Sequence, residues 1–446
     1  MKKKHTYRSV DVQKVDASRL LTLLPAPLVI VGIDVAKRRQ VAALCDPQGH
    51  HQLLVHFEHP QQTPTFMSLL LGLKTQGKTV QMAMEPTGTY GDILCHQAHQ
   101  RKLEVFLISP KKTHDAAEVF DGVPSYHDAK DATVVARLHA QGVSRRWEPT
   151  EAMRRELRAS VTRRELHARQ REALYGELEG LLARHWPELE KALDVRQQRS
   201  ALLLLMEYPE PRAVAAAPRE AQQALRRACR GMLGPAVYEA LVSGAQQTLG
   251  VEMLPAERAL LMEVASELLR LDRRVEEFDG MLAEQIKAHP TLGPAARLVG
   301  LTTMAIIYAH MGDLANYGSA GALVKAMGLN LKEASSGESG RRPFRPGVHI
   351  TKRGPGIVRK YLYLATLRWL QEDAIAQAWY KARIGYTPTS KIRAVVALMR
   401  KLVRGLWHLS RGSGYEAERL FDVRRLKLEP VAVVEVPRPK QPEVTM

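Results

Sequence analysis

Four carboxylates of this chain have the residue types and the placement of a divalent-metal site. They are Asp34, Glu85, Asp128 and Asp131. The chain as a whole is basic, with 65 Lys and Arg against 47 Asp and Glu and a formal net charge of +18. Mg²⁺ prefers oxygen ligands, and a pair of such ions clamps the attacking and leaving oxygens of a phosphoryl transfer. Acids of this kind in a basic protein predict a metal-dependent enzyme that acts on nucleic acid.

Two of these acids are expected at the ends of strands. Residues 29–34 form a β-branched apolar run that is too short for a helix, so the pattern predicts a buried strand with Asp34 at its carboxyl end. Residues 80–84 form an alternating run that leads to Glu85, after which a Pro and a Gly break the strand. Both carboxylates are therefore predicted to lie at carboxyl ends of strands.

The other two acids share a helix that we expect over residues 126–139. Asp128 and Asp131 are three residues apart and so lie on one helical face. The runs 41–44 and 53–57, joined by a turn, complete an antiparallel meander with the first strand. A three-stranded meander followed by alternating helix and strand, with acids on the first strand, the fourth strand and the last helix, predicts a ribonuclease-H-like α/β fold.

The carboxy-terminal part of the chain is predicted to bind nucleic acid. Between residues 341 and 411 there are sixteen Lys or Arg against only Glu372 and Asp373, an excess of fourteen positive charges. Cations bind the phosphate backbone, and the aromatic side chains interleaved here are typical of DNA or RNA contact surfaces. The simpler alternative is a solvated face. The candidate contact residues are Arg341, Arg342, Arg345, Lys352, Arg353, Arg359 and Lys360.

The middle of the chain is predicted to be helical. Residues 151–185 are rich in Arg, Glu and Leu and predict one long helix. In residues 261–282 the apolar positions alternate spacings of three and four, the heptad pattern of a coiled coil. Those positions are Leu261, Val264, Leu268, Leu271, Val275, Phe278 and Leu282. The two segments could pair antiparallel within one chain, form a seam between two chains, or belong to an ordinary helix bundle.

Cysteine usage and hydropathy indicate a cytoplasmic protein outside the membrane. Cys45, Cys95 and Cys229 are isolated, without the spacing of a zinc site or a disulfide framework, which favours a reducing compartment. The uncharged stretch between Arg297 and Asp313 is shorter than the roughly 18 apolar residues that a membrane span needs.

A serine-rich loop precedes the basic segment. Residues 335–340 read Ser-Ser-Gly-Glu-Ser-Gly and predict a flexible loop, and most loops of this composition are turns. A serine beside Arg341 and Arg342 could also attack a phosphodiester, because cationic groups stabilise the charge on the transferring phosphoryl group.

Short motifs in both halves of the chain together resemble one protein family. The amino-terminal motifs are Gly32-Ile33-Asp34-Val35-Ala36-Lys37, Glu85-Pro86-Thr87-Gly88 and Asp128-Ala129-Lys130-Asp131-Ala132. The carboxy-terminal motifs are Gly300-Leu301-Thr302 with Gly312-Asp313, Gly328-Leu329 before Ser336-Gly337, Ile350 to Gly354, and Arg400-Lys401. In this order they resemble the DEDD transposases of the insertion-sequence one-ten family, relatives of the Piv-type DNA invertases. The resemblance spans about residues 31–415.

The resemblance implies a site in each half of the chain. In the RuvC-like amino-terminal domain, the four acids would bind Mg²⁺. In the other half Ser336, eight residues past Gly328, matches the nucleophilic serine of the family, whereas Ser335 and Ser339 do not. This chain departs from the family pattern at Leu331, where the family usually has proline. The departure bears on the choice among the three serines.

The resemblance also implies partners. In this family the serine lies beside the carboxylate site of another protomer, and an element-encoded bridge RNA pairs with donor and target DNA. We therefore expect DNA of the element ends and the target, a bridge RNA, and a homo-oligomer of two to four chains. A phosphoserine intermediate would retain the energy of the broken bond, so rejoining would need no nucleotide cofactor.

Five segments are expected along the chain. They are an amino-terminal extension at 1–27, a RuvC-like catalytic domain at 28–145, a helical coiled-coil region at 146–289, a mainly α transposase domain at 290–428 and a disordered tail at 429–446. The leading hypothesis for their function is a transposase or site-specific recombinase. The alternatives are a RuvC-like structure-selective nuclease, such as a Holliday-junction resolvase, that uses the acids alone, and a non-catalytic nucleic-acid-binding protein.

Overall fold

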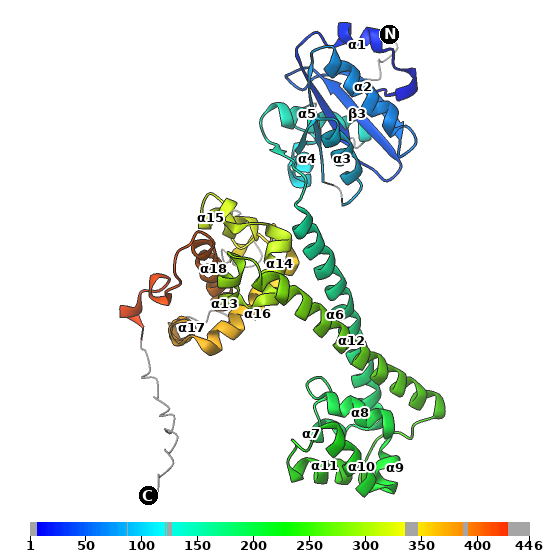
Figure 1. Cartoon of the computed structure of the whole chain (residues 1–446), viewed down its shortest axis with the longest axis vertical. Coiled ribbons are helices and arrows are strands. Elements are labelled where there is room, and N and C mark those ends of the chain that lie inside the picture. Colours follow the sequence, from blue (N-terminus) through cyan, green and yellow to red (C-terminus); the bar gives the residue numbers. More distant parts are fainter. Residues whose placement is uncertain are drawn as a thin grey trace, which may run out of the picture. The chain divides into compact units, whose positions relative to one another are not determined.

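The computed structural model describes residues 7–86, 88–120, 122, 127–334, 347–386 and 391–426. The chain divides into two compact units, Met1–Thr150 and Glu151–Met446 (Figure 1). The first unit is an α/β domain, and the second is largely helical. The tail expected at 429–446 lies outside the described residues.

A mixed sheet forms the centre of the first unit. Within the described residues it has seven strands in the order β1-β4-β3-β2-β5-β6-β7. The strands are β1 (Val10–Asp11), β2 (Leu28–Asp34), β3 (Arg39–Cys45), β4 (His51–Glu58), β5 (Thr79–Met84), β6 (Glu104–Leu107) and β7 (Arg145–Arg146). β2, β3 and β4 form the antiparallel meander, and β5 and β6 continue the sheet parallel to β2. This order confirms the predicted ribonuclease-H-like arrangement.

Helices cover both faces of this sheet. On one face lie α1 (Ala17–Leu23), α2 (Thr63–Thr75) and α3 (Asp92–Gln100), and on the other lie α4 (Pro110–Ala116) and α5 (Asp128–Ala140). The central strands are apolar on both faces, so both faces need such cover. On the first face the rings of Phe57 and Phe66 stack with their centroids 4.3 Å apart. On the second face the apolar core that α5 shares with β2 and β3 contains alanines of α5, among them Ala132 and Ala136.

Two long helices of the second unit pair within one chain. They are α6 (Ala152–His185) and α12 (Pro255–Lys287). The start of α12 meets the end of α6, since Leu261 shares a core with Leu182. The end of α12 meets the start of α6, since Leu282 shares another core with Leu157. The pair is therefore antiparallel. All seven predicted heptad positions are buried, so the seam that the sequence left open is an intrachain one.

Each end of this helix pair is surrounded by shorter helices with a core of their own. Near the end of α6 these are α7 (Leu189–Ala192), α8 (Arg199–Glu207), α9 (Pro211–Ala216), α10 (Pro218–Ala228) and α11 (Pro235–Gln246). Near its start they are α13 (Leu292–Val299), α14 (Leu301–Met311), α15 (Ala320–Ala326), α16 (Gly356–Glu372), α17 (Ala374–Tyr386) and α18 (Lys391–Ser410), with a hairpin of β8 (Leu331–Ala334) and β9 (Gly347–Ile350). We call this second group the C-terminal core.

The apolar segment between Arg297 and Asp313 is an interior helix of the C-terminal core. In the described part of the chain no single helix is long and apolar enough to cross a membrane. α13 and α14 reach that length only together, and they bend by 119° at Gly300. α14 is buried along almost its whole length, which explains its lack of charge.

Candidate active site

Asp34 and Glu85 lie side by side at one edge of the sheet. Asp34 is the last residue of β2, and Glu85 directly follows β5. The two strands are parallel and paired in register, with Ile33 opposite Met84. The carboxyl ends of parallel neighbouring strands lie at the same edge of the sheet. Asp34 follows Ile33 and Glu85 follows Met84, so the two strands bring two carboxylates to that edge.

A glycine in β2 brings the other two acids to the same place. Gly32 allows α5 to approach so closely that a Cβ on it would lie 2.1 Å from the carbonyl oxygen of Ala132. Asp128 and Asp131 occupy the first turn of α5, beyond this contact. His127 caps the start of this helix, since its Nδ1 accepts a 3.2 Å hydrogen bond from the backbone N–H of Lys130. The structure thus assembles all four predicted acids from β2, β5 and α5.

The acids raise one another's pKa values. Burial, followed by the negative charges of Asp128, Asp131 and Glu85, raises the pKa of Asp34 to about 7. Burial and Asp131 raise the pKa of Glu85. Burial and Asp128 raise the pKa of Asp131, against the opposing positive charges of His127 and Lys130. Carboxylates that repel one another in a partly buried site favour the arrival of a proton or a cation.

The donor chemistry of this group suits a hard divalent cation, because all four side chains offer carboxylate oxygens. Their positions do not form a complete ligand set: over the residues that the structure describes, no three His, Cys, Asp or Glu side chains converge as ion ligands. The carboxylate of Glu85 accepts a hydrogen bond from the hydroxyl of Thr113 on α4.

The structural roles of two residues at this site were not predicted from the sequence. Gly32 positions α5, and a glycine inside a predicted strand is the signal that could have revealed it, since it often marks a close backbone approach. Thr113 holds Glu85 from a different helix, and no local pattern distinguishes it from other threonines.

The predicted nucleophile, Ser336, lies outside the described residues, as do Ser335 and Ser339. The chain enters and leaves this segment through the β8–β9 hairpin, in which Ala334 pairs with Gly347. Ser336 therefore follows the end of β8 by two residues.

Two glycines of the C-terminal motifs lie where one backbone crosses another. A Cβ on Gly328 would lie 2.7 Å from the backbone of Arg353, and one on Gly354 would lie 2.3 Å from the carbonyl oxygen of Ala326. Both have positive φ, +73° and +144°, which L side chains rarely adopt. The base of the hairpin is therefore built against the turn that follows α15.

The predicted nucleic-acid-binding residues fall into distinct groups. Arg341, Arg342 and Arg345 lie outside the described residues. Lys352 and Arg353 are exposed in the turn between β9 and α16. Arg359 is half-buried and donates hydrogen bonds to the carbonyl oxygens of Gly354 and Met327, at 2.8 and 3.3 Å. Arg359 thus holds the local backbone, while Lys352 and Arg353 are available to phosphates.

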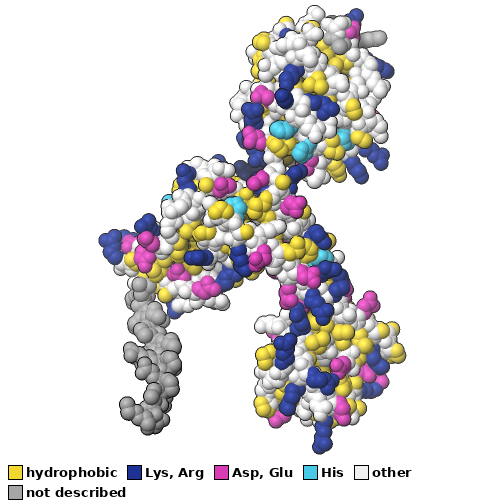
Figure 2. All heavy atoms as spheres, in the orientation of Figure 1, with side chains coloured by type: hydrophobic (Ala, Val, Ile, Leu, Met, Phe, Trp, Pro, Cys, Tyr) yellow, Lys and Arg dark blue, Asp and Glu magenta, His cyan; other side chains and the backbone are white. Residues whose placement is uncertain are grey.

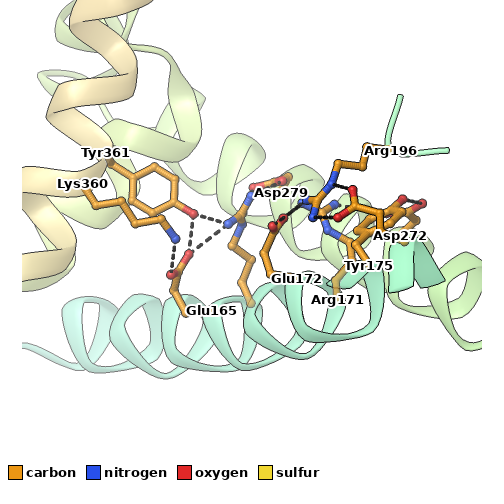
Figure 3. Close-up of polar contacts among 11 residues, drawn as sticks. Glu165, Arg171, Glu172, Tyr175, Arg196, Asp272, Asp279, Lys360 and Tyr361 are labelled. Atoms are coloured by element: carbon orange, nitrogen blue, oxygen red, sulfur yellow. Dashed lines mark hydrogen bonds and ion pairs between the residues drawn. The ribbon is translucent and has the colours of Figure 1, made fainter. Parts of the chain in front are cut away.

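Lys360 belongs to a polar network that joins α6, α12 and α16 (Figure 3). Its ammonium lies 3.2 Å from Glu165, which also accepts a hydrogen bond from the hydroxyl of Tyr361. Arg164 donates to that hydroxyl and binds Asp279 through two hydrogen bonds of 2.9 and 3.0 Å. The two acids and two cations balance one another. The network fastens the helix pair to the C-terminal core.

Positive charge is spread over the visible surface. On the face in Figure 2, Lys and Arg side chains alternate with acidic ones and do not gather in one patch. Cations of the C-terminal core also bind backbone carbonyls: Arg368 binds that of Val299, and Lys401 binds that of Leu420. The charge excess in the sequence therefore overstates the number of cations free for nucleic acid.

Comparison with known families and proteins gives matches in both halves of the chain. A DEDD transposase family matches residues 31–187, and the family described as "Transposase IS116/IS110/IS902 family" matches residues 298–381. The first match contains all four acids, and the second spans the β8–β9 hairpin.

Individual relatives extend these matches over most of the chain. The insertion element IS110 43.6 kDa protein of Streptomyces coelicolor is 24% identical over 401 residues, covering 87% of this chain and 96% of that protein. The insertion element IS116 44.8 kDa protein of Streptomyces clavuligerus is also 24% identical, covering 85% and 94%. A pilin gene-inverting protein of Moraxella bovis is 28% identical over 143 residues, 31% of this chain and 43% of that protein.

Proposed function

This chain belongs to the IS110 family of transposases, enzymes that recombine DNA, and from this membership we propose that it cuts and rejoins DNA through a Mg²⁺-dependent acid site and a phosphoserine intermediate. The observation that carries the proposal is the assembly of four carboxylates from β2, β5 and α5, with the pKa of Asp34 raised to about 7. The family implies a divalent metal ion, and we propose Mg²⁺ because all four side chains offer oxygen ligands.

The acid site would hold and orient the scissile phosphate. Asp34 and the α5 acids would provide oxygen ligands from a rigid strand end and a rigid helix start, and Glu85 would complete the set on leaving Thr113. When bound, Mg²⁺ supplies electrostatic stabilisation of the charge on the transferring phosphoryl group. The raised pKa values of Asp34 and Asp131 mean that these carboxyl groups retain their protons more readily without a cation. A bound cation would offset the repulsion and favour the ionised, ligating form.

Ser336 would be the attacking group. Its hydroxyl loses a proton and its oxygen bonds to phosphorus while the bond from phosphorus to the leaving sugar oxygen breaks, and that oxygen takes up a proton. Rejoining reverses these steps with a new strand end, so the phosphoester energy is retained. The family match over residues 298–381 supports this assignment, because it includes the position of Ser336 and distinguishes the chain from a nuclease that has the acid domain alone.

The remaining expectations are carried by the same membership. We propose a bridge RNA as guide, the element ends and the target as DNA substrates, and a dimer or tetramer in which one protomer's serine serves another's acids. We also retain the division into segments 1–27, 28–145, 146–289, 290–428 and 429–446 as a proposal.

A trapped reaction on DNA carrying joined element ends tests the chemistry. Ser336→Ala should lose both the protein–DNA adduct on a denaturing gel and the recombinant products, while Ser335→Ala and Ser339→Ala keep both. Peptide mass spectrometry should map the adduct to Ser336. Asp34→Asn should bind DNA without cutting it. Cleavage without any adduct in the wild-type protein would refute the serine step and identify a resolvase-type nuclease.

A further inference from the structure

The C-terminal core contains a hollow of about 450 Å³, within the size range of small-ligand sites. Its wall is formed by α13, the end of α16 and the chain around the end of α18. The polar and aromatic side chains that line it are Arg297, Trp369, Glu372, Asp373 and Tyr415. Glu372 and Asp373 are the two acids of the otherwise basic stretch 341–411, and both line this hollow. The hollow is far removed in sequence from the four acids of the first unit and shares no residue with them.

Asp373 fixes the aromatic part of the wall. Its Oδ2 accepts hydrogen bonds from the indole N–H of Trp369 at 3.1 Å and from the hydroxyl of Tyr415 at 3.4 Å. Its Oδ1 accepts the backbone N–H of Ala376 at 2.9 Å. Both oxygens are thus occupied, and two rings from distant segments are held in position. Asp373 is a positioning residue and has little capacity left for a ligand.

Glu372 and Arg297 remain available to a ligand. Both are exposed, and the described residues offer neither of them a hydrogen bond or an ion pair. The hollow therefore combines one free carboxylate, one free guanidinium and the half-buried ring of Tyr415, while Trp369 is only 4% exposed and supports the wall from within the core. This set complements a nucleotide: aromatic side chains stack on a base, a carboxylate accepts its N–H groups, and a guanidinium binds its phosphate.

We propose that this hollow binds one unpaired nucleotide and prefers guanine. A carboxylate has two acceptor oxygens, and the Watson–Crick edge of guanine has two adjacent donors, N1–H and the 2-amino group. On the same edge adenine and cytosine each offer one amino group, and thymine and uracil each offer one N3–H, so none of these bases presents two adjacent donors. The cations of the stretch 341–411 attract the phosphate backbone of a nucleic acid. The negative charge of Glu372 repels phosphate, so this carboxylate favours contact with the edge of a base. The proposal is independent of the cleavage chemistry.

Binding in EDTA tests the proposal with no contribution from cleavage. The full-length protein is titrated into labelled duplexes with a single bulged G, A, C or T, into matching RNA duplexes with U, and into a fully paired duplex. The wild-type protein should bind the bulged G about tenfold more tightly than the bulged T, the discrimination expected of one bidentate contact. The DNA and RNA sets show which nucleic acid provides the base.

Two variants with the same change in charge separate base recognition from electrostatics. Glu372→Gln and Glu263→Gln, the latter on the exposed face of α12, each remove one negative charge. Glu263→Gln should keep the preference for G, whereas Glu372→Gln should reduce it to about twofold, since one of two contacts is lost. Tyr415→Ala should also lose the preference, while Tyr415→Phe retains the ring and most of it.

Three results would overturn the proposal. These are equal affinity of the wild-type protein for all bulged bases, a preference for G that survives in Glu372→Gln, and an equal gain in affinity for every duplex in both Gln variants. The proposal would also fail if Glu372→Gln changed the oligomeric state, measured by sedimentation, without changing the base preference. Glu372 would then bind an arginine of a second copy of the chain instead of a base.

Discussion

Gly32 and Ala132 touch through their backbones, and this contact sets the height of α5 above β2. A Cβ on Gly32 would lie 2.1 Å from the carbonyl oxygen of Ala132 and 2.8 Å from the Cβ of Ala136. Backbone atoms cannot move aside as the end of a flexible side chain can. The positions of Asp128 and Asp131 relative to Asp34 therefore depend on a residue without a side chain.

Replacement of Gly32 should separate the acids. Gly32→Ala is expected to push α5 from the sheet and to destabilise the protein by about 2–3 kcal/mol, the upper part of the range for an overpacked core. DNA cleavage should fall more than DNA binding. Gly72→Ala is the matched control, since Gly72 is in α2 with nothing within 4 Å of an added Cβ, and it should stabilise by about 0.5–1 kcal/mol. Urea unfolding measures both, and an unchanged Gly32→Ala protein would contradict the contact.

The stability of the cation-free protein should depend on pH through Asp34. Its pKa is raised from 3.8 to about 7, first by burial and then by Asp128, Asp131 and Glu85. The folded state therefore binds more protons than the unfolded state between these values, so the free energy of unfolding falls as the pH rises from about 4 to about 7. Asp34→Asn should be more stable than the wild type by about 2 kcal/mol at pH 8 and nearly equal to it at pH 5. Urea titrations in EDTA at both pH values would show the same difference if Asp34 ionised like an exposed carboxyl.

A divalent cation should reverse this dependence. Ligand carboxylates must be ionised to bind a cation, so Mg²⁺ or Mn²⁺ should raise the melting temperature more at pH 8 than at pH 5. At a concentration one hundred times the dissociation constant, the stabilisation is about 2.7 kcal/mol. Differential scanning calorimetry should show no such rise for Asp34→Asn, whereas Asp92→Asn, in α3, should respond like the wild type. An equal rise in both variants would place the ion elsewhere.

Salt dependence should separate free cations from structural ones. Lys352→Glu and Arg353→Glu should weaken DNA binding for all sequences, and each lost phosphate contact should reduce the slope of log affinity against log salt by about 1. Arg359→Ala should act mainly on stability, because its guanidinium binds the carbonyl oxygens of Gly354 and Met327. Fluorescence anisotropy from 50 to 200 mM salt, as is usual for such slopes, gives the comparison. An Arg359→Ala protein that melts normally but loses a unit of slope would contradict this division.

Local patterns in the sequence determined the elements of the first unit. The run that ends at Asp34 and the break after Glu85 predicted β2 and β5, because a buried strand and a Pro-Gly stop are both properties of neighbouring residues. β1 and β7 were not predicted. Each has two residues, too few to show a period, and each exists because a longer strand offers it an edge.

The heptad pattern in α12 likewise predicted an apolar stripe but did not identify the helix that covers it. Periodicity shows which face of a helix must be covered, and it contains nothing about what covers it. The tertiary structure covers Leu261 and Leu282 with opposite ends of α6 of the same chain. Charge counts likewise do not show what each cation binds. Arg359 and Lys360 each add one positive charge to the count, yet Arg359 binds carbonyl oxygens and Lys360 binds Glu165.

Only the tertiary structure decided which distant groups share a site. Thr113 meets Glu85 across 28 positions of sequence, and Tyr415 meets Asp373 across 42. Contacts of this kind depend on how helices cross and how closely their backbones approach. Those distances follow from the packing of whole elements, so residues near one another in the chain do not record them.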